Sequence, residues 1–316
     1  MALRNSPSFS IRDQLREEPI LVLLLMMILY MISGGILVPG VLAILELAFD
    51  LGPGDMQAIL AGKFAIHESS RSIFRLAQIS HQLLSWGFMA GIMAALLGNV
   101  KEQLALESPR HRAQVLIAAL LLLVSIPFAQ FLYLSPEQLP LPESMAEWRA
   151  DMIQLEKTSL FALQSLLSEK GVSLLILNLL IFALVPAVCE EFFFRGILQR
   201  QLSEMMDIRW AILLTGLLFS LVHFQLSGLI SRLWLGTLLG WLLWRSGSIW
   251  PGIVAHFVFN ASLVSYAWWT TQQGTYQPTE LVVVAWYWGL LSLAATLGLM
   301  WWFAKLSRTL LNSPPQ

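Results

Sequence analysis

Residues 172–200 of the chain read VSLLILNLLIFALVPAVCEEFFFRGILQR. The first eighteen residues of this stretch are almost entirely apolar, which is close to the roughly 20 residues that a membrane-spanning helix needs. Glu190, Glu191 and Arg195 follow, but the apolar pattern continues around them, so we predict that one helix runs through all three. An ionisable side chain inside a span costs about 2.5 to 3.5 kcal/mol on insertion scales, which makes these three residues functional candidates.

The composition of the whole chain is that of a membrane protein. Of its 316 residues 57% are hydrophobic and 12% charged, with a mean hydropathy of +0.68. Soluble domains are about 45 to 50% apolar and about 25% charged. The formal net charge is −1, so no basic surface is available for nucleic acid. We therefore expect the lipid bilayer as a partner and exclude nucleic acid. The single cysteine, Cys189, excludes a disulfide bond within the chain.

Apolar runs of spanning length divide the chain into eight predicted helices. They lie near residues 20–47, 76–98, 113–134, 172–200, 207–225, 229–244, 249–270 and 281–304. We therefore predict an all-α fold, a polytopic membrane bundle of about eight transmembrane helices.

The distribution of lysine and arginine predicts the orientation, because cytoplasmic loops are enriched in both. With the N-terminus inside, the inner segments hold twelve of these residues, Arg4 among them, and the outer segments hold six. We therefore expect both termini in the cytoplasm. The connection 135–171 contains six acids, and its part from 145 to 167 has an amphipathic pattern, so we expect that part to lie on the outer surface. Its apolar side would consist of Trp148, Met152, Leu155, Phe161 and Leu163.

Glu191 and Arg195 are four residues apart, so they lie on one face of the predicted helix and can form an ion pair. Glu190 points about 100° away and stays available. Pro186 cannot donate a hydrogen bond to the carbonyl of Phe182, which loosens the helix one turn before the acids. Taken alone, the charged residues could also mark the cytoplasmic end of the span, with side chains that reach water.

Two further spans carry polar side chains in strongly apolar surroundings. His223 ends the run FSLVH at 219–223 in the fifth span, and His256 and Asn260 share one face of the seventh. At about 1.5 Å per residue, Glu190, His223 and His256 lie roughly 15, 21 and 16 Å from the nearest inner-boundary arginine. These depths are compatible, so we expect the polar side chains to meet in one cavity inside the bilayer.

A carboxylate and an imidazole can together polarise a water molecule. We hypothesise that Glu190 is a general base and that His223 helps to bind and activate the water. The Glu191 pair with Arg195 would support them. His256 and Asn260 would donate hydrogen bonds to the oxyanion of a tetrahedral intermediate. Two other ionisable side chains, His81 and Arg232, lie within predicted spans. We expect them to pack in the interior or to line the cavity.

Three motifs occur in a fixed order: EEFFFR at 190–195, FSLVH at 219–223 and HFVFN at 256–260. In these motifs the chain resembles the CAAX prenyl protease type II family, also called the abortive-infection or CPBP family of intramembrane proteases. The resemblance covers about residues 172–265. It implies an all-helical membrane bundle and peptidase activity, with catalytic roles on the matching positions Glu190, Glu191, Arg195, His223, His256 and Asn260.

The resemblance leaves the catalytic type open between a glutamic and a metallo-endopeptidase. The family has been described as metalloproteases, and a glutamate that activates water without a metal has also been proposed for it. If a metal such as Zn²⁺ is used, the candidate ligands are Glu190, His223 and His256, from three separate helices. No His-Glu-x-x-His motif occurs in the sequence.

We predict an intramembrane endopeptidase of CAAX-protease type that hydrolyses a peptide bond of a membrane-associated protein or peptide, in a bacterial inner membrane. Its three regions would be an N-terminal three-span region with the acidic loop at 1–171, a catalytic core at 172–270, and the last span with a cytoplasmic tail at 271–316. One alternative is a non-catalytic membrane immunity or regulatory protein. Another is a proton-coupled transporter that relays protons through the buried acids and histidines.

Overall fold

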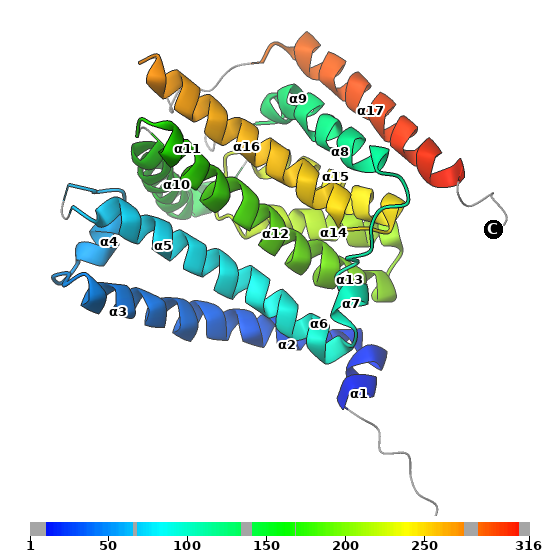
Figure 1. Cartoon of the computed structure of the whole chain (residues 1–316), viewed down its shortest axis with the longest axis horizontal. Coiled ribbons are helices and arrows are strands. Elements are labelled where there is room, and N and C mark those ends of the chain that lie inside the picture. The colour runs from blue at the N-terminus through cyan, green and yellow to red at the C-terminus, as the bar shows by residue number, and fades with distance from the viewer. Residues whose placement is uncertain (1–10, 66–67, 134–140, 168, 275–283, 310–316) are drawn as a thin grey trace, which may run out of the picture.

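All regular elements in the described part of the chain are helices (Figure 1). The structure is a computed structural model, and it describes residues 11–65, 68–133, 141–167, 169–274 and 284–309. Arg4 and the predicted tail beyond residue 309 lie outside these ranges. The predicted all-α class is confirmed.

Five helices in the described ranges are long and apolar enough to cross a membrane: Pro19–Ala48, Ser70–Leu97, Ala113–Phe131, Val172–Met205 and Trp286–Ser307. They coincide with five of the eight predicted spans and run roughly side by side along the long axis of the molecule (Figure 1). The first three consist of α2 (Pro19–Ile32), the π-helical turn η1 (Ser33–Leu37), α3 (Val38–Ala48), α5 (Ser70–Gln82), the π-helical turn η2 (Leu83–Phe88), α6 (Met89–Leu97), α8 (Ala113–Val124) and α9 (Ile126–Phe131). The fifth lies in α17 (Trp286–Thr309).

The fourth spanning helix carries the paired acids, and its α-helical winding is interrupted by two π-helical turns. Its elements are α11 (Val172–Leu179), the π-helical turn η5 (Leu180–Leu184), α12 (Val185–Glu191), the π-helical turn η6 (Phe192–Leu198) and α13 (Gln199–Met205). Pro186 lies at the start of α12, where a missing N–H is tolerated. The acids thus lie on a short α-helical segment between two wider turns, an arrangement that is frequent at functional sites.

Helices α14 (Ile208–Leu221), α15 (Leu229–Ser246) and α16 (Trp250–Gln272) occupy the other three predicted positions. The 14 residues of α14 extend about 21 Å, which is less than the roughly 30 Å of a hydrocarbon core. The total of eight transmembrane helices therefore stays a prediction. Helices α14 and α15 approach closely, because a Cβ on Gly236 would lie 3.0 Å from the Cα of Gly216.

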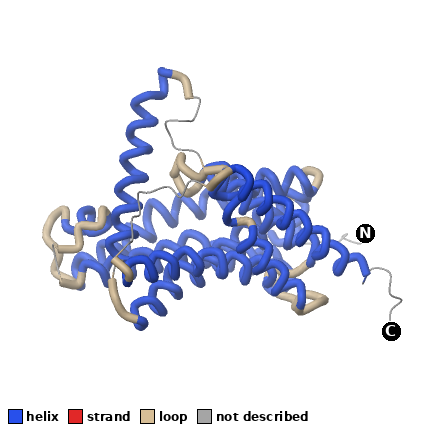
Figure 2. The backbone as a smooth tube through the Cα atoms, turned by 90° about the horizontal axis from the view of Figure 1, so that it is seen from above, coloured by secondary structure: helices blue, strands red, loops and turns tan. Residues whose placement is uncertain are grey.

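The connections hold the short helices α1 (Ile11–Glu17), α4 (Asp55–Leu60) and α7 (Val100–Gln103), a 3₁₀ turn (Glu143–Met145), and the long helix α10 (Ala146–Leu167). Helix α10 runs across the bundle axis, at the end opposite α1 and the C-terminal end of α17 (Figures 1 and 2). A helix thus occupies the segment 145–167 for which an amphipathic pattern was noted, and its place on the outer membrane surface stays a prediction. Trp148, Leu155 and Phe161 of its predicted apolar side are exposed, whereas Glu156 and Ala162 are buried against the bundle.

The fourth spanning helix contributes to the first of two hydrophobic clusters and packs against α16, which belongs to the second. One joins its second half to the first two spanning helices, with Trp86, Met93 and Phe194 at its centre. The other joins α8, α15, α16 and α17 around Leu121 and Phe303. Glu190 and Glu191 therefore lie between the first two spanning helices and the group that contains α8, α15, α16 and α17.

Candidate active site

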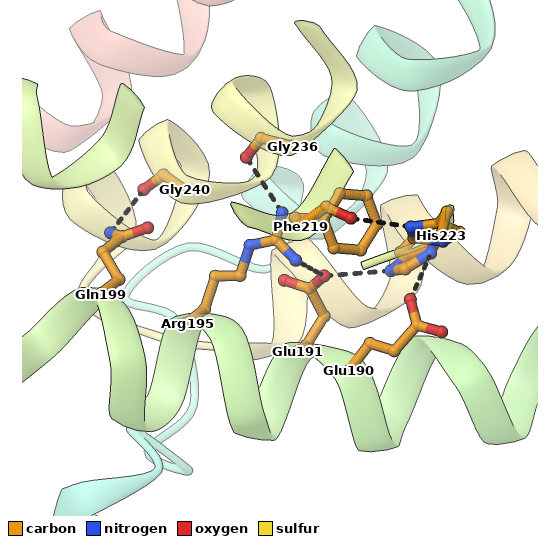
Figure 3. A network of polar contacts seen from close by, with 9 residues as sticks. Glu190, Glu191, Arg195, Gln199, Phe219, His223, Gly236 and Gly240 are labelled. Atoms are coloured by element: carbon orange, nitrogen blue, oxygen red, sulfur yellow. Dashed lines mark hydrogen bonds and ion pairs between the residues drawn. The ribbon is translucent and has the colours of Figure 1, made fainter. Parts of the chain in front are cut away.

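Glu191 and Arg195 form the predicted ion pair, and both are fully shielded from solvent. The Arg195 Nη1 lies 2.7 Å from Oε1 of Glu191, and both side chains are at most 1% exposed. Arg195 also donates from Nη2 to the carbonyl of Gly236, at 3.0 Å, and its guanidinium lies 4.6 Å from the ring centre of Phe219. A buried charge pair needs such additional hydrogen bonds to offset its desolvation. Arg195 thereby fixes the orientation of Glu191 and joins η6 to α15 (Figure 3).

His256 connects Glu191 with Glu190. Its Nδ1 lies 3.0 Å from Oε1 of Glu191, and because a carboxylate paired with an arginine can only accept, Nδ1 is the donor. Its Nε2 lies 3.8 Å from Oε2 of Glu190. Gly252, one turn before His256, leaves room for the acid, since a Cβ there would lie 3.1 Å from Oε2 of Glu191. Helix α16 therefore brings His256 into contact with both Glu190 and Glu191.

Glu190 has a second contact, from a helix outside the predicted core. Nε2 of Gln82, at the end of α5, donates to Oε1 of Glu190 at 3.1 Å. Glu190 itself is 6% exposed. The other side-chain atom of this amide, Oε1 of Gln82, is buried without a hydrogen-bond partner among the described residues. Gln82 is a site residue that the sequence analysis missed, because a single glutamine in a span gives no motif.

His223 lies just outside the helix to which it was assigned. The predicted span 207–225 is wrong at its end, since α14 stops at Leu221 and His223 lies in the following turn. The reason is local capping: Nδ1 of His223 hydrogen-bonds the carbonyl of Phe219 at 2.7 Å, which occupies one of the free acceptors at the helix end. A carbonyl can only accept, so Nδ1 carries the proton and Nε2 keeps a free lone pair.

The ring of Phe219 connects the two histidines. Its centroid lies 5.0 Å from that of His223 and 5.8 Å from that of His256. Asn260 follows His256 by one turn on α16 and is half-buried. Within the described residues its side chain has no hydrogen-bond or ion-pair partner, so the geometry brings five of the six predicted residues into one set of contacts and leaves Asn260 at its edge.

The burial of these residues increases in one direction. Asn260 and His223 are half-buried, and Phe224, next to His223, is 61% exposed. Glu191 and Arg195, in contrast, are 0% exposed. The site is thus more open at His223 than at the ion pair.

A second polar contact joins the fourth spanning helix to α15, one turn beyond Arg195. Gln199, one turn after Arg195, donates from Nε2 to the carbonyl of Gly240 at 3.1 Å (Figure 3). Both side chains therefore bind backbone carbonyls of α15 that lie one turn apart. At Gly240 the glycine allows the close approach of Gln199, because a Cβ there would collide with the Gln199 amide, whereas a Cβ on Gly236 would meet Gly216 and Phe219 instead.

The predicted metal ligands do not form a metal site in this arrangement. Zinc in proteins is held by three or four His, Cys, Asp or Glu side chains at about 2.0 to 2.3 Å. Among the described residues there is no group of three such side chains that could hold a metal ion. Glu190, His223 and His256 therefore do not fit the ligand set that the sequence allowed.

The apolar helices and the buried acid, arginine and histidine network define a helical membrane protein with a candidate hydrolytic site. Residues 172–262, less than a third of the chain, match the family described as type II CAAX prenyl endopeptidase Rce1-like. The predicted resemblance to CAAX-type intramembrane proteases is thereby confirmed for this segment, which contains all six predicted site residues. No curated protein and no solved structure matches the chain at a significant level.

Proposed function

We propose that the chain is an intramembrane endopeptidase, in which Glu190 and His223 activate a water molecule for attack on a peptide bond. The observation that carries this proposal is the contact of Glu190 with His256, which is itself anchored by the buried Glu191 and Arg195 pair. The match of the same segment to a protease family supports the reaction class.

In the proposed reaction Glu190 removes a proton from the water while the water oxygen attacks the carbonyl carbon of the substrate. The free Nε2 of His223 accepts a hydrogen bond from the same water, because its Nδ1 is engaged with the helix end. The bond between carbon and nitrogen then breaks. Glu190 returns the proton to the leaving amine, so the products are a carboxylic acid and an amine and the enzyme is regenerated.

His256 and Asn260 would stabilise the negative charge that develops on the carbonyl oxygen. Since Nδ1 of His256 is held by Glu191, its remaining nitrogen, Nε2, is the one that faces Glu190 and the substrate side. A proton on Nε2 would make His256 a donor at this position, while Nδ1 stays bonded to Glu191. The amide of Asn260 provides a second donor one helical turn away. Removing one oxyanion donor typically costs about 10²- to 10³-fold in rate.

The substrate would be a peptide segment associated with the membrane. The open end of the site lies at His223 and the exposed Phe224, while apolar residues surround it on the helix exteriors. A segment that reaches the site from this side remains in an apolar environment. Glu191 and Arg195 are themselves fully shielded, which keeps bulk water away from this ion pair.

The test is incubation of purified protein in detergent with a library of membrane peptides, prenylated and unprenylated, followed by mass spectrometry. We expect cleavage products with wild type and none with Glu190→Gln or His223→Ala, at unchanged thermal stability. Glu204→Gln is the matched control, because Glu204 is an exposed acid on the same spanning helix. We expect it to cleave like wild type.

Two results would contradict the proposal. Products from Glu190→Gln at the wild-type rate would remove Glu190 from the chemistry and favour a non-catalytic protein or another site. Complete loss of cleavage with a chelator, restored by Zn²⁺, would contradict activation of water by the side chains alone.

A further inference from the structure

The segment that carries His223 is a seven-residue linker, residues 222–228, between α14 and α15. It is non-helical, and the short α14 places it about 21 Å from the start of that helix, within the thickness of a bilayer. Non-helical backbone at such depth requires hydrogen bonds from the protein itself, because lipid offers none. The backbone of the linker therefore needs hydrogen-bond partners within the protein. These partners also determine the position of His223.

Arg232, in the first turn of α15, supplies most of these hydrogen bonds. Its Nη2 donates to the carbonyls of Gln225 and Ser227 at 2.5 and 2.8 Å, and its Nη1 donates to the side chain of Gln225 at 3.0 Å. Gly228 permits this turn, since it has a φ of 70° and a Cβ there would lie 3.2 Å from Nη1 of Arg232. One guanidinium thus binds three acceptors of the linker.

Two residues from other parts of the chain contact the same linker. Oε2 of Glu156, on the crosswise helix α10, accepts from the backbone N–H of Ser227 at 3.3 Å, and Glu156 is 6% exposed. The ring of Tyr133, which follows α9, lies against the end of the linker, since a Cβ on Gly228 would be 3.3 Å from it. The linker is therefore held by Tyr133, by Glu156 of α10 and by Arg232 of α15, in addition to its own turn.

The fixed linker holds a strained residue beside His223. Phe224 has a φ of 50°, a left-handed conformation that is uncommon for a bulky residue and is strained. Such a conformation persists only where the surroundings impose it. The adjacent His223 is held at its other end by its contact with the carbonyl of Phe219.

We propose that Arg232 is a positioning residue for His223, and that it acts with Glu156 and Tyr133 through the linker rather than on the substrate. Without the guanidinium, two carbonyls and one side chain of the linker lose their donor, and Phe224 can relax. The imidazole of His223 then leaves its present position beside the ring and carbonyl of Phe219. This inference rests on the proposed peptidase function, and it adds a role for Arg232 that the three motifs do not contain.

The test compares Arg232→Met and Arg232→Lys with Arg245→Met. Arg245 lies at the other end of α15 and donates from Nη2 to the carbonyl of Ala304, far from the linker. A displacement of a catalytic group by about 1 Å can lower the rate about 100-fold. We expect kcat to fall about 10- to 100-fold in Arg232→Met and less in Arg232→Lys, with KM changed less than about twofold. Arg245→Met should keep the wild-type kcat.

A spectroscopic measurement separates this inference from the peptidase proposal. In protein with isotope-labelled histidine, the ring signals of His223, assigned with a His223→Gln variant, should shift in Arg232→Met while those of His256 stay in place. Arg232→Met with unchanged kcat and unchanged His223 signals would overturn the positioning role. Absence of peptide cleavage by wild type would overturn the proposed function, whereas the His223 signals would still report on the contact with the linker.

Discussion

Replacement of Arg195 by methionine removes a cation from a position with 0% solvent exposure. Glu191 then keeps its charge in the interior with His256 as its remaining close partner, and the carbonyl of Gly236 loses its donor. Breaking a buried pair by removing one member costs about 3 to 5 kcal/mol of folding free energy. We therefore expect Arg195→Met to lower the free energy of unfolding by about 3 to 5 kcal/mol, which is roughly two to four orders of magnitude in the folding equilibrium.

An exposed ion pair of the same chain provides the comparison. Arg71 lies 3.6 Å from Glu169, and the Arg71 side chain is 46% exposed. Such pairs contribute about 0 to 1 kcal/mol, so Arg71→Met should change the free energy of unfolding by no more than about 1 kcal/mol. The contrast between the two arginines isolates the effect of burial, because the substitution is the same.

The assay is reversible unfolding in mixed micelles with increasing denaturing detergent, followed by circular dichroism. A double variant, Arg195→Met with Glu191→Gln, tests the electrostatic origin of the loss. The introduced amide would remain an acceptor for Nδ1 of His256 but carries no charge, so we expect the double variant to be more stable than Arg195→Met by about 2 kcal/mol. A single variant within about 1 kcal/mol of wild type, or a double variant that is no more stable than the single one, would refute this reasoning.

Two further substitutions test the space and the hydrogen bonding around the acids. Gly252→Ala brings a Cβ to 3.1 Å from a Glu191 oxygen, whereas Gly298→Ala meets nothing within 4 Å. We expect the first variant to be less stable than the second by about 1 to 3 kcal/mol in the same unfolding assay, and equal stabilities would contradict the packing. Gln82→Leu removes the donor 3.1 Å from Glu190, and hydrogen bonds to charged groups contribute about 1.5 to 3 kcal/mol. We expect about a 10- to 100-fold loss of cleavage rate at unchanged KM, and wild-type rates would exclude Gln82 from the site.

Local patterns sufficed for the parts of the site that lie within one helix. Glu191 and Arg195 pair because they are four residues apart on continuous helical backbone, and this pairing was predictable from spacing alone. The five spanning helices in the described ranges were also predictable, since apolar runs of that length have few other uses. The sequence predicted that His256 and the acids lie at compatible depths, whereas the contact of His256 with both acids is seen only in the structure.

Contacts between distant segments required the structure. Gln82 reaches Glu190 because α5 packs against α12, and no periodicity in the sequence encodes that packing. The end of α14 was mispredicted because the apolar run continues past it, while the side chain of His223 caps the helix and Arg232 binds the following backbone. Helix ends of this kind depend on tertiary hydrogen bonds more than on local propensity.

The central claim is that Glu190 acts as the base for the attacking water. The most direct measurement is the initial rate of cleavage of one peptide substrate by Glu190→Gln, at equal folded fraction, with Glu204→Gln in parallel. The account predicts a fall of at least about 10²-fold for Glu190→Gln, in the range typical of a lost general base, and a rate within about twofold of wild type for Glu204→Gln. A Glu190→Gln rate above about a tenth of the wild-type rate would contradict it.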